Sequence, residues 1–313
     1  MKITRRELGK LALSVPAASL LGRNLSAYSA APDSTFAGVR VGMNVPYNYG
    51  PQNRAMPVDD VIAKTVALNI STVELRAQPI ELLMGAQTSA LEPARGAQKE
   101  AAEALRAWRQ QAKASDAAKA KKQFDAAGIK IDIVKFDNIY NFTDPELDYA
   151  FALAKAAGAR AISCELEVEG AKRVGQFADK HNFPVGYHGH TKTPESMFKE
   201  AFAAAKHNWA NLDIGHYIAG NLGDPVDFIR RYHDRITHIH VKDRKKKQEN
   251  GNDGDNVPFG QGDTPVKECL RLIRDNKWPI TAVIEFEYPV PQGSDRMAEM
   301  AKCVQYCKDA LLS

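Results

Sequence analysis

The sequence predicts a single-domain (β/α)8 TIM barrel. Three observations lead to this prediction: eight short β-branched runs follow residue 37, helical patterns separate them, and the chain past its first thirty residues has about the size of one barrel. Strands that alternate with helices favour a parallel sheet, and eight strands close one into a barrel. No G-x-G-x-x-G motif follows the first run, which disfavours a doubly wound open sheet.

The expected elements follow one another in regular order. The strands are expected at residues 39–45, 72–75, 129–136, 160–165, 184–190, 210–214, 236–242 and 281–286. The helices are expected at residues 58–68, 93–127, 145–157, 171–181, 194–206, 225–232, 265–276 and 296–311. Four of these helices begin with Asp or Thr followed by Pro, at residues 144, 193, 224 and 264, which is a typical helix start.

The second helical segment is too long for one barrel helix. Residues 86–122 are rich in Ala, Gln, Lys and Arg, so we expect a helical insertion around residues 80–125. It would extend the connection after the second strand, where it could cover the barrel mouth.

The overall charge is mildly positive. The net charge of +4 lacks the dense basic face that nucleic-acid binding requires, so no nucleic-acid partner is expected. The basic run at residues 244–247 is expected to be a solvated loop. The cysteines form no C-x-x-C pair, which disfavours a disulfide framework and a structural zinc site; they are Cys164, Cys269, Cys303 and Cys307.

Residues 1–31 have the layout of a targeting segment. The stretch TRRELGK at residues 4–10 precedes an apolar run at 11–21 and small residues at 26–31. This arrangement resembles a twin-arginine signal peptide, which implies recognition by the twin-arginine export machinery and a periplasmic or otherwise exported protein. The apolar run is too short for a stable membrane anchor. We therefore expect the barrel to occupy residues 32–313.

Five consecutive strands end in groups that can bind a metal ion. They carry Glu165, His188 and His190, Asp213 and His216, His238 and His240, and Glu285 and Glu287. The carboxyl ends of all barrel strands meet at one mouth, and burying such groups together without a cation is costly. Carboxylates and neutral imidazoles are natural ligands of divalent metals. The sequence therefore predicts one divalent metal ion, whose identity among Mn, Co, Mg and Zn stays open.

The alternation of side chains along a strand narrows the choice of ligands. His238 and His240 point the same way, as do Glu285 and Glu287. The histidine nearer the mouth is favoured, which is His240. In the last strand Glu285 is favoured, and Glu287 is assigned to the rim.

Four short motifs carry a family resemblance. They are LDIGH at residues 212–216, HIHVKD at 238–243, GQGD at 260–263 and IEFE at 284–287. In order and spacing they resemble the xylose isomerase-like sugar isomerase/epimerase superfamily, which also includes the class II apurinic endonucleases. The resemblance implies a metal set of Glu, Asp, His and Glu, with Asp213, His240 and Glu285 carried over directly. The fourth ligand is either His188, which stands on the strand where the epimerases have Glu, or Glu165.

The resemblance also implies a mechanism. The metal would polarise a carbonyl and stabilise the enediolate formed when a neighbouring C–H loses its proton to Glu165 or Glu285. His216 and Lys242 could donate to developing oxyanions and, together with His190, would contact the substrate. The substrate would be a small sugar, free or glycosidic rather than phosphorylated if the protein is exported.

Several outcomes remain open at this point. A sugar isomerase or epimerase is the first hypothesis, but His188 in place of a carboxylate weakens a two-base mechanism. A lyase or dehydratase acting on a keto-sugar or 3-keto-glycoside is the alternative, and a non-catalytic sugar-binding barrel is the third. A metal nuclease is disfavoured because the first three strands contain no histidine. A homo-oligomer is possible.

Overall fold

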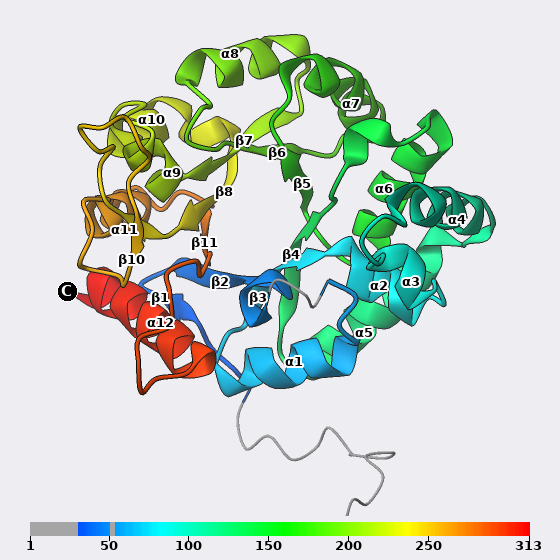
Figure 1. Cartoon of the computed structure of the whole chain (residues 1–313), viewed down its shortest axis with the longest axis horizontal. Helices are drawn as coiled ribbons and strands as arrows, with labels where there is room; N and C mark the ends of the chain where they lie inside the picture. Colours follow the sequence, from blue (N-terminus) through cyan, green and yellow to red (C-terminus); the bar gives the residue numbers. More distant parts are fainter. Residues whose placement is uncertain (1–30, 51–53) are drawn as a thin grey trace, which may run out of the picture. The chain divides into compact units, whose positions relative to one another are not determined.

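Within residues 31–50 and 54–313, which the computed structural model describes, eight parallel strands close into a barrel (Figure 1). They are β2 (Val39–Val45), β3 (Thr72–Arg76), β4 (Lys130–Lys135), β5 (Ala161–Glu165), β6 (Val185–His188), β7 (Asn208–Asp213), β8 (Ile236–Val241) and β11 (Thr281–Ile284). Each strand pairs with the next, and β11 pairs with β2, which closes the cylinder. The predicted single-domain TIM barrel is therefore confirmed.

Helices surround the barrel as the alternation predicts. They are α1 (Val58–Ala67), α6 (Asp144–Ala156), α7 (Val168–His181), α8 (Glu195–Ala204), α10 (Pro225–Tyr232), α11 (Val266–Asp275) and α12 (Arg296–Leu312). A short helix, α9 (Ile214–Ala219), follows β7 directly and was not predicted. Of the four predicted starts, Asp224 caps α10 by accepting from the amide of Val226. The capping residue of α6 is Thr143 instead of Asp144, because Thr143 forms a capping box with Glu146.

The predicted long helix at residues 93–127 is wrong in detail. The chain between β3 and β4 instead contains α2 (Ala77–Leu83), α3 (Thr88–Leu91), α4 (Gln98–Gln111) and α5 (Ala118–Ala126), and it is extended at Ala112 between α4 and α5. The break has a packing reason, because α4 contacts α3 and α6 whereas α5 packs on β4 and α1 as the barrel helix of this unit. The helices α2 to α4 lie beside the barrel in Figure 1.

Two small antiparallel pairs complete the sheet structure. The strand β1 (Thr35–Phe36) folds back on β2, and β9 (Asp243–Arg244) pairs with β10 (Asn256–Val257) just after β8 ends. Four short 3-10 turns lie in the connections: Tyr47–Tyr49, Ala114–Ala117, Ile139–Asn141 and His233–Arg235.

Alternation along the strands separates an apolar layer from a polar barrel interior. In β8, Ile239 and Val241 belong to the hydrophobic core, whereas His238 and His240 contact Glu74 of β3 inside the barrel. Register brings functional groups side by side, since Asp213 is paired with His240 and Glu165 with His188. The strand ends therefore present polar side chains to one mouth, as the sequence predicts.

The N-terminal prediction is left untested by this structure. The predicted twin-arginine signal at residues 1–31 lies, except for Ala31, outside the described residues. Among the described helices, none has the length and apolar character needed to cross a membrane.

Candidate active site

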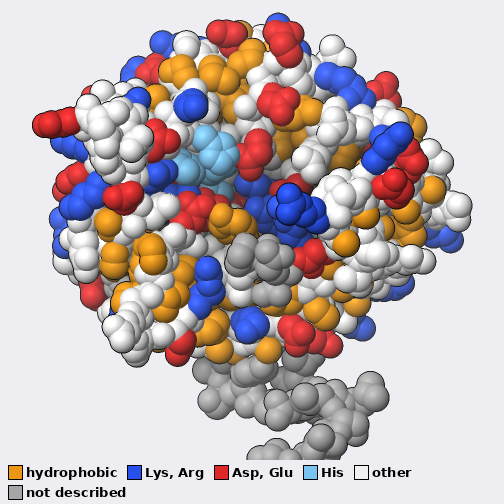
Figure 2. All heavy atoms as spheres, viewed as in Figure 1, with side chains coloured by type: hydrophobic (Ala, Val, Ile, Leu, Met, Phe, Trp, Pro, Cys, Tyr) orange, Lys and Arg blue, Asp and Glu red, His pale blue; other side chains and the backbone are white. Residues whose placement is uncertain are grey.

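Four buried side chains with metal-binding atoms converge at the barrel mouth. His188 ends β6, Asp213 ends β7, His240 lies near the end of β8, and Glu285 directly follows β11. Each offers one ligand atom, and these atoms all lie within 4.8 Å of one another. Figure 2 shows histidine and acidic side chains gathered at this opening. The structure thus brings three of the predicted ligands together with His188, and Glu165 is outside this group.

Glu74 fixes the orientation of the His240 ring by contacting the nitrogen that faces away from Asp213 and Glu285. The Nε2 atom of His240 lies 2.6 Å from Oε2 of Glu74, and a carboxylate can only accept, so Nε2 carries the proton. The other nitrogen, Nδ1, lies 3.2 Å from Oε2 of Glu285 and 3.9 Å from Oδ2 of Asp213. Nδ1 is therefore the nitrogen that faces the carboxylates.

Several buried atoms of this group have no hydrogen-bond partner among the described residues. They are Nδ1 of His188, Oδ2 of Asp213, Nδ1 of His240 and Oε2 of Glu285. Buried polar atoms are rarely left unpaired, and two carboxylate oxygens with two imidazole nitrogens are a suitable donor set for a divalent ion. The residues present fit a metal ion of the kind predicted.

The pKa shifts of these side chains also favour a bound cation. Burial opposes charge on His240, but Glu285 and Glu74 outweigh it and raise its pKa to about 10. Burial also raises the pKa of Asp213, although the Lys242 ammonium works against this shift. Burial, helped by the nearby Lys135, holds the pKa of His188 well below its usual value, so His188 is neutral and able to bind a metal. The cluster favours additional positive charge.

Lys242 lies among three carboxylates. Its Nζ is 3.1 Å from Oδ2 of Asp213, 2.7 Å from Oε2 of Glu285 and 2.6 Å from Oε2 of Glu287. Burial opposes its charge, but Asp213, Glu285 and Glu287 outweigh it and raise its pKa, so Lys242 is an ammonium. It contacts Oδ2 of Asp213 and Oε2 of Glu285, the same two oxygens that a metal ion would use.

Glu165 forms a separate ion-paired group at the rim. Its Oε1 is 2.8 Å from Nζ of Lys135, and its Oε2 is 2.6 Å from Nε2 of His190. Burial raises the pKa of Glu165, but Lys135 and His190 outweigh it and lower the pKa to about 2. The hydrogen bond to Glu165 raises the pKa of His190. Glu165 is therefore an ionised carboxylate that is 42% exposed at the side chain and lies near the four-residue group.

His216 links this site to the loop after β8. Its Nε2 is 3.3 Å from Nζ of Lys242, and its Nδ1 contacts Nη1 of Arg244. Burial, together with Lys242, lowers the pKa of His216 to about 2, so the imidazole is neutral. Arg244 is buried, which corrects the expectation of a fully solvated basic run, whereas residues 245–247 are exposed as expected.

The predicted glycine turn holds the residue next to Lys242. The carboxylate of Asp243 accepts from the amides of Gly260 at 2.8 Å, Gly262 at 2.9 Å and Thr264 at 3.3 Å. A Cβ atom on Gly262 would lie 1.9 Å from Asp243 Oδ1, so only glycine fits there. The turn fixes the backbone at the point where β8 leaves the barrel.

Sequence reasoning missed two charged residues in buried strands. Glu74 contacts both His238 and His240, which outweigh burial and hold its pKa well below the usual value. Lys135 binds Glu165, and its side chain is almost fully buried. The charged residues inside the apolar runs TVEL and IDIVKF were the available signal, since such residues are rarely buried without a partner.

Fold and side-chain cluster together define a TIM barrel with a metal-type donor set at its catalytic end. A family model described as "Xylose isomerase-like TIM barrel" matches residues 89–307. The chain belongs to this family.

The chain also resembles individual proteins. It is 23% identical over 158 residues to an inosose dehydratase of Clostridium perfringens (strain 13 / Type A), a match that covers 45% of this chain and 52% of the relative. The chain therefore spans about half the length of this curated relative. Its fold is similar to a xylose isomerase domain protein from Planctomyces limnophilus (TM-score 0.59, 14% identity, 87% and 96% of the two chains). It is also similar to the IOLI protein with a bound zinc atom (TM-score 0.56, 12% identity, 87% and 96%).

Proposed function

We propose that this protein is a metal-dependent sugar isomerase or epimerase that removes a proton next to a carbonyl group. One observation carries the proposal: four buried side chains bring their ligand atoms within 4.8 Å of one another at the mouth of the barrel. His188, Asp213, His240 and Glu285 would hold one divalent ion, and a structurally similar protein binds zinc. The bound ion would act as a Lewis acid toward a substrate carbonyl and its neighbouring hydroxyl.

Glu165 is the better candidate for the base. It is ionised, partly exposed at the rim, and outside the group assigned to the metal, whereas Glu285 is buried within that group. The contacts with Lys135 and His190 also reduce its basicity. We therefore expect a substrate oxygen to draw one of these two partners away from Glu165 before it takes the proton.

Lys242 and His216 would stabilise the substrate oxygen on which negative charge develops. Lys242 is a fixed ammonium that can donate to an oxygen on which negative charge develops. His216 is neutral and lies beside it, which lets one ring nitrogen carry a proton and the other accept. His190 stands exposed at the rim next to Glu165, where it would contact the substrate.

One observation favours a lyase or dehydratase as the second candidate. His188 occupies the strand position where a second carboxylate would be needed for proton transfer on the opposite face. With a single base, the enolate formed after proton removal can expel a substituent on the adjacent carbon, which leaves with the bonding electron pair. The similarity to an inosose dehydratase supports this alternative, with a keto-sugar or 3-keto-glycoside as substrate.

Proton abstraction is tested by isotope exchange. Metal-loaded protein is incubated in deuterated water with aldoses, ketoses and 3-keto-glycosides, and the products are followed by NMR. We expect deuterium in at least one substrate, and loss of both the metal and the exchange in His240→Ala. A protein that takes up no Mn, Co, Mg or Zn and exchanges no proton would instead be a non-catalytic sugar-binding barrel. Export and oligomeric state are separate proposals, tested by fractionation and by light scattering.

A further inference from the structure

We propose that the cavity between the end of β4 and helices α2 to α4 binds a second ring of the substrate, so that the protein acts on a glycoside or disaccharide. This inference rests on the proposed function, since it assigns the reacting ring to the barrel mouth. The ligand class is a neutral, hydroxyl-bearing ring with an apolar face, which both sugars and phenols provide.

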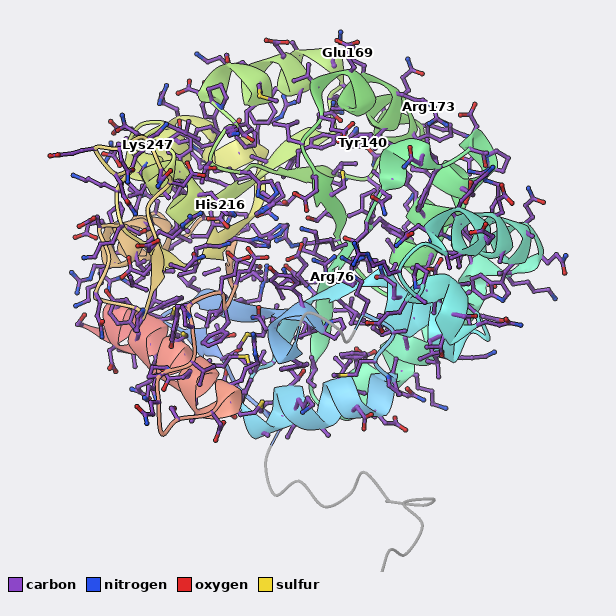
Figure 3. The ribbon with its side chains drawn as sticks, viewed as in Figure 1. Arg76, Tyr140, Glu169, Arg173, His216 and Lys247 are labelled. Atoms are coloured by element: carbon purple, nitrogen blue, oxygen red, sulfur yellow. The ribbon has the colours of Figure 1, made fainter. Side chains whose placement is uncertain are left out.

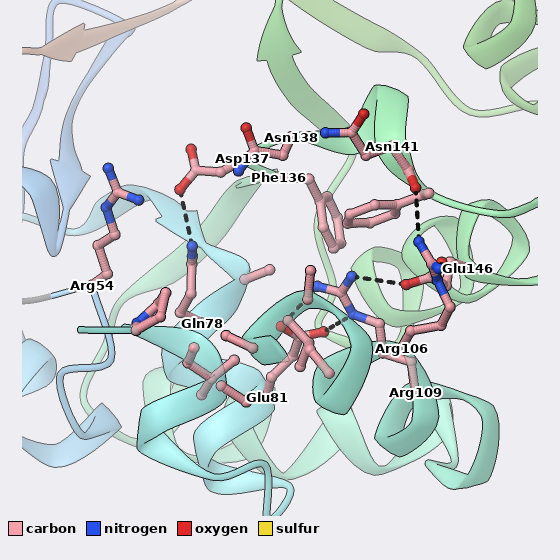
Figure 4. A pocket seen from close by; sticks show the side chains of 18 of the residues that line it. Arg54, Gln78, Glu81, Arg106, Arg109, Phe136, Asp137, Asn138, Asn141 and Glu146 are labelled. Atoms are coloured by element: carbon pink, nitrogen blue, oxygen red, sulfur yellow. Dashed lines mark hydrogen bonds and ion pairs between the residues drawn. The ribbon is translucent and has the colours of Figure 1, made fainter. Parts of the chain in front are cut away.

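The cavity has the size of a small ligand site. Its volume is about 330 Å³, and it lies between the helical insertion and the segment that follows β4 (Figure 4). Ligand pockets start at roughly 300 Å³. Its apolar side includes Leu91, Leu105, Phe136 and Phe142, with the two phenylalanine rings packed edge to face. These groups suit the apolar face of a ring.

Four charged residues of the cavity wall neutralise one another, and Arg54 also lines the cavity but takes no part in these pairs. Arg109 lies 2.8 Å from Glu81 and 3.4 Å from Glu146, and Arg106 lies 3.1 Å from Glu146. Two arginines and two glutamates thus pair within the wall. A phosphate or carboxylate ligand would have to compete with these carboxylates for the arginines, whereas a neutral ligand would not.

Uncharged polar groups are available to bind hydroxyls. Gln78 donates from Nε2 to Asp137 at 2.9 Å, while its Oε1 is buried and has no hydrogen-bond partner among the described residues. An unmade buried hydrogen bond is costly, so a ligand hydroxyl that donates to this oxygen would gain binding energy. The exposed amides of Asn138 and Asn141 line the same cavity, and each can donate and accept.

The cavity adjoins the proposed active site. Lys135 points to Glu165, whereas the next residue, Phe136, lines the cavity, so the end of β4 separates the two sites. On the rim, Asp137 pairs with Arg76, which Figure 3 places at the barrel mouth. The side chain of Arg76 covers the ring of Tyr47 at 5.0 Å.

From Tyr47 the contacts continue into the metal-type group. Its hydroxyl donates to Glu287 at 2.6 Å, and Glu287 contacts Lys242 at 2.6 Å. Tyr47, Arg76 and Asp137 thus connect Glu287 at the barrel mouth with the wall of the cavity, and the proposal places the link between the two rings of the substrate along these side chains.

The first test measures ligand binding without turnover. Methyl glucoside, methyl maltoside and phenyl glucoside have no free carbonyl group, and their binding to the metal-loaded full-length protein is measured by saturation-transfer NMR. We expect the two-ring compounds to bind at least tenfold more tightly than methyl glucoside. Methyl maltoside and phenyl glucoside distinguish a sugar subsite from a phenol subsite. Equal affinity for one-ring and two-ring compounds would overturn the proposal.

Three substitutions test where the second ring binds. Leu105→Trp fills the cavity from α4, and Ala104→Trp places the same ring on the exposed side of that helix. We expect Leu105→Trp to remove the two-ring preference and Ala104→Trp to keep it. Gln78→Met should weaken two-ring binding about fivefold to tenfold through loss of one buried hydrogen bond. If all three variants keep the preference, the second ring lies elsewhere and the assignment is wrong.

Proton exchange separates this inference from the proposed reaction. In Leu105→Trp we expect unchanged deuterium uptake by 3-keto-glucose and at least a tenfold rise in KM for 3-keto-maltose or phenyl 3-keto-glucoside. A wild-type protein that prefers two rings but exchanges no proton would support the cavity assignment and overturn the proposed reaction. Equal loss of exchange with one-ring and two-ring substrates in Leu105→Trp would overturn the cavity assignment.

Discussion

Glu74 Oε2 lies 2.6 Å from His240 Nε2, although the two residues are 166 positions apart in the chain. This contact fixes which imidazole nitrogen faces Asp213 and Glu285. A metal-binding histidine commonly donates its second ring N–H to a carboxylate, which orients the ring and increases its basicity. Glu74 is thus a positioning residue for the proposed metal site.

Replacing Glu74 should weaken metal binding without removing a ligand. In Glu74→Gln the neutral amide polarises His240 less, and we expect metal affinity about tenfold to a hundredfold lower. Calorimetric titration with Mn, Co or Zn measures this change, with the exposed Glu103→Gln as control. Unchanged affinity in Glu74→Gln would mean that His240 is not a ligand or is held by other contacts.

A pair of variants decides the fourth ligand. We expect His188→Ala to lose metal binding by about a hundredfold or more, because it removes a donor from the buried group. Glu165→Gln should keep stoichiometric metal and lose at least about a hundredfold in exchange rate, as expected for a general base. Metal analysis and deuterium uptake are measured on both proteins. The reverse pattern, with metal lost only in Glu165→Gln, would place Glu165 in the metal site.

Lys242 should oppose metal binding while it supports the reaction. Its ammonium contacts Asp213 Oδ2 and Glu285 Oε2, so a divalent ion must compete with it. In Lys242→Met we expect metal affinity equal to or higher than that of the wild type, and exchange slower by about a hundredfold. Calorimetry and NMR give the two values separately. Parallel losses of metal and activity would show that Lys242 supports the site structurally instead.

An acid-sensitive ion pair at the opposite end of the barrel offers a test of stability. Asp132 is fully buried and contacts Arg160 at 2.9 Å and Thr281 at 2.8 Å. Burial raises its pKa, but Arg160 and other cations outweigh it and lower the pKa below the ordinary value of 3.8. Its stabilising effect is therefore complete above about pH 4 and is lost as the pH falls further.

Substitution of Asp132 should remove this pH dependence. We expect Asp132→Asn to lower the free energy of unfolding by about 2 to 3 kcal/mol at pH 7. The difference from the wild type should shrink below pH 4 in urea titrations. Asp227→Asn, which breaks an exposed pair with Arg230, should change stability by less than about 0.5 kcal/mol. A difference that stays constant down to pH 2 would contradict the assigned ionisation of Asp132.

The sequence predicts the barrel well because the relevant signals are local. Strand and helix periodicity are read over a few residues, and parallel closure then places all carboxyl ends at one mouth. The convergence of Asp213, His240 and Glu285 follows from this alone. Because His240 lies nearer the mouth than His238, the sequence also favours His240 for the four-residue group.

The sequence does not indicate which charged side chains of distant strands pair inside the barrel. The contact of Glu74 with His240 and that of Lys135 with Glu165 join distant strands, and no local pattern indicates which charges meet. For the same reason the sequence leaves the choice between His188 and Glu165 open, and the geometry favours His188, since Glu165 is outside the four-residue group with its Oε2 4.0 Å from His188 Nε2. The break between α4 and α5 also depends on packing partners, since Ala-rich residues favour helix on either side of it.

The turn around Asp243 determines which part of the loop after β8 can vary in evolution or be redesigned. The chain leaves the barrel at Asp243 and is bound again to that same carboxylate at residues 260–264. The loop between these two points therefore has both ends anchored. Lengthening a surface loop costs little free energy. The exposed residues 247–252 can therefore be shortened, extended or exchanged for a new recognition segment, whereas Gly254, whose carbonyl accepts from Arg244, and β10 must keep their positions.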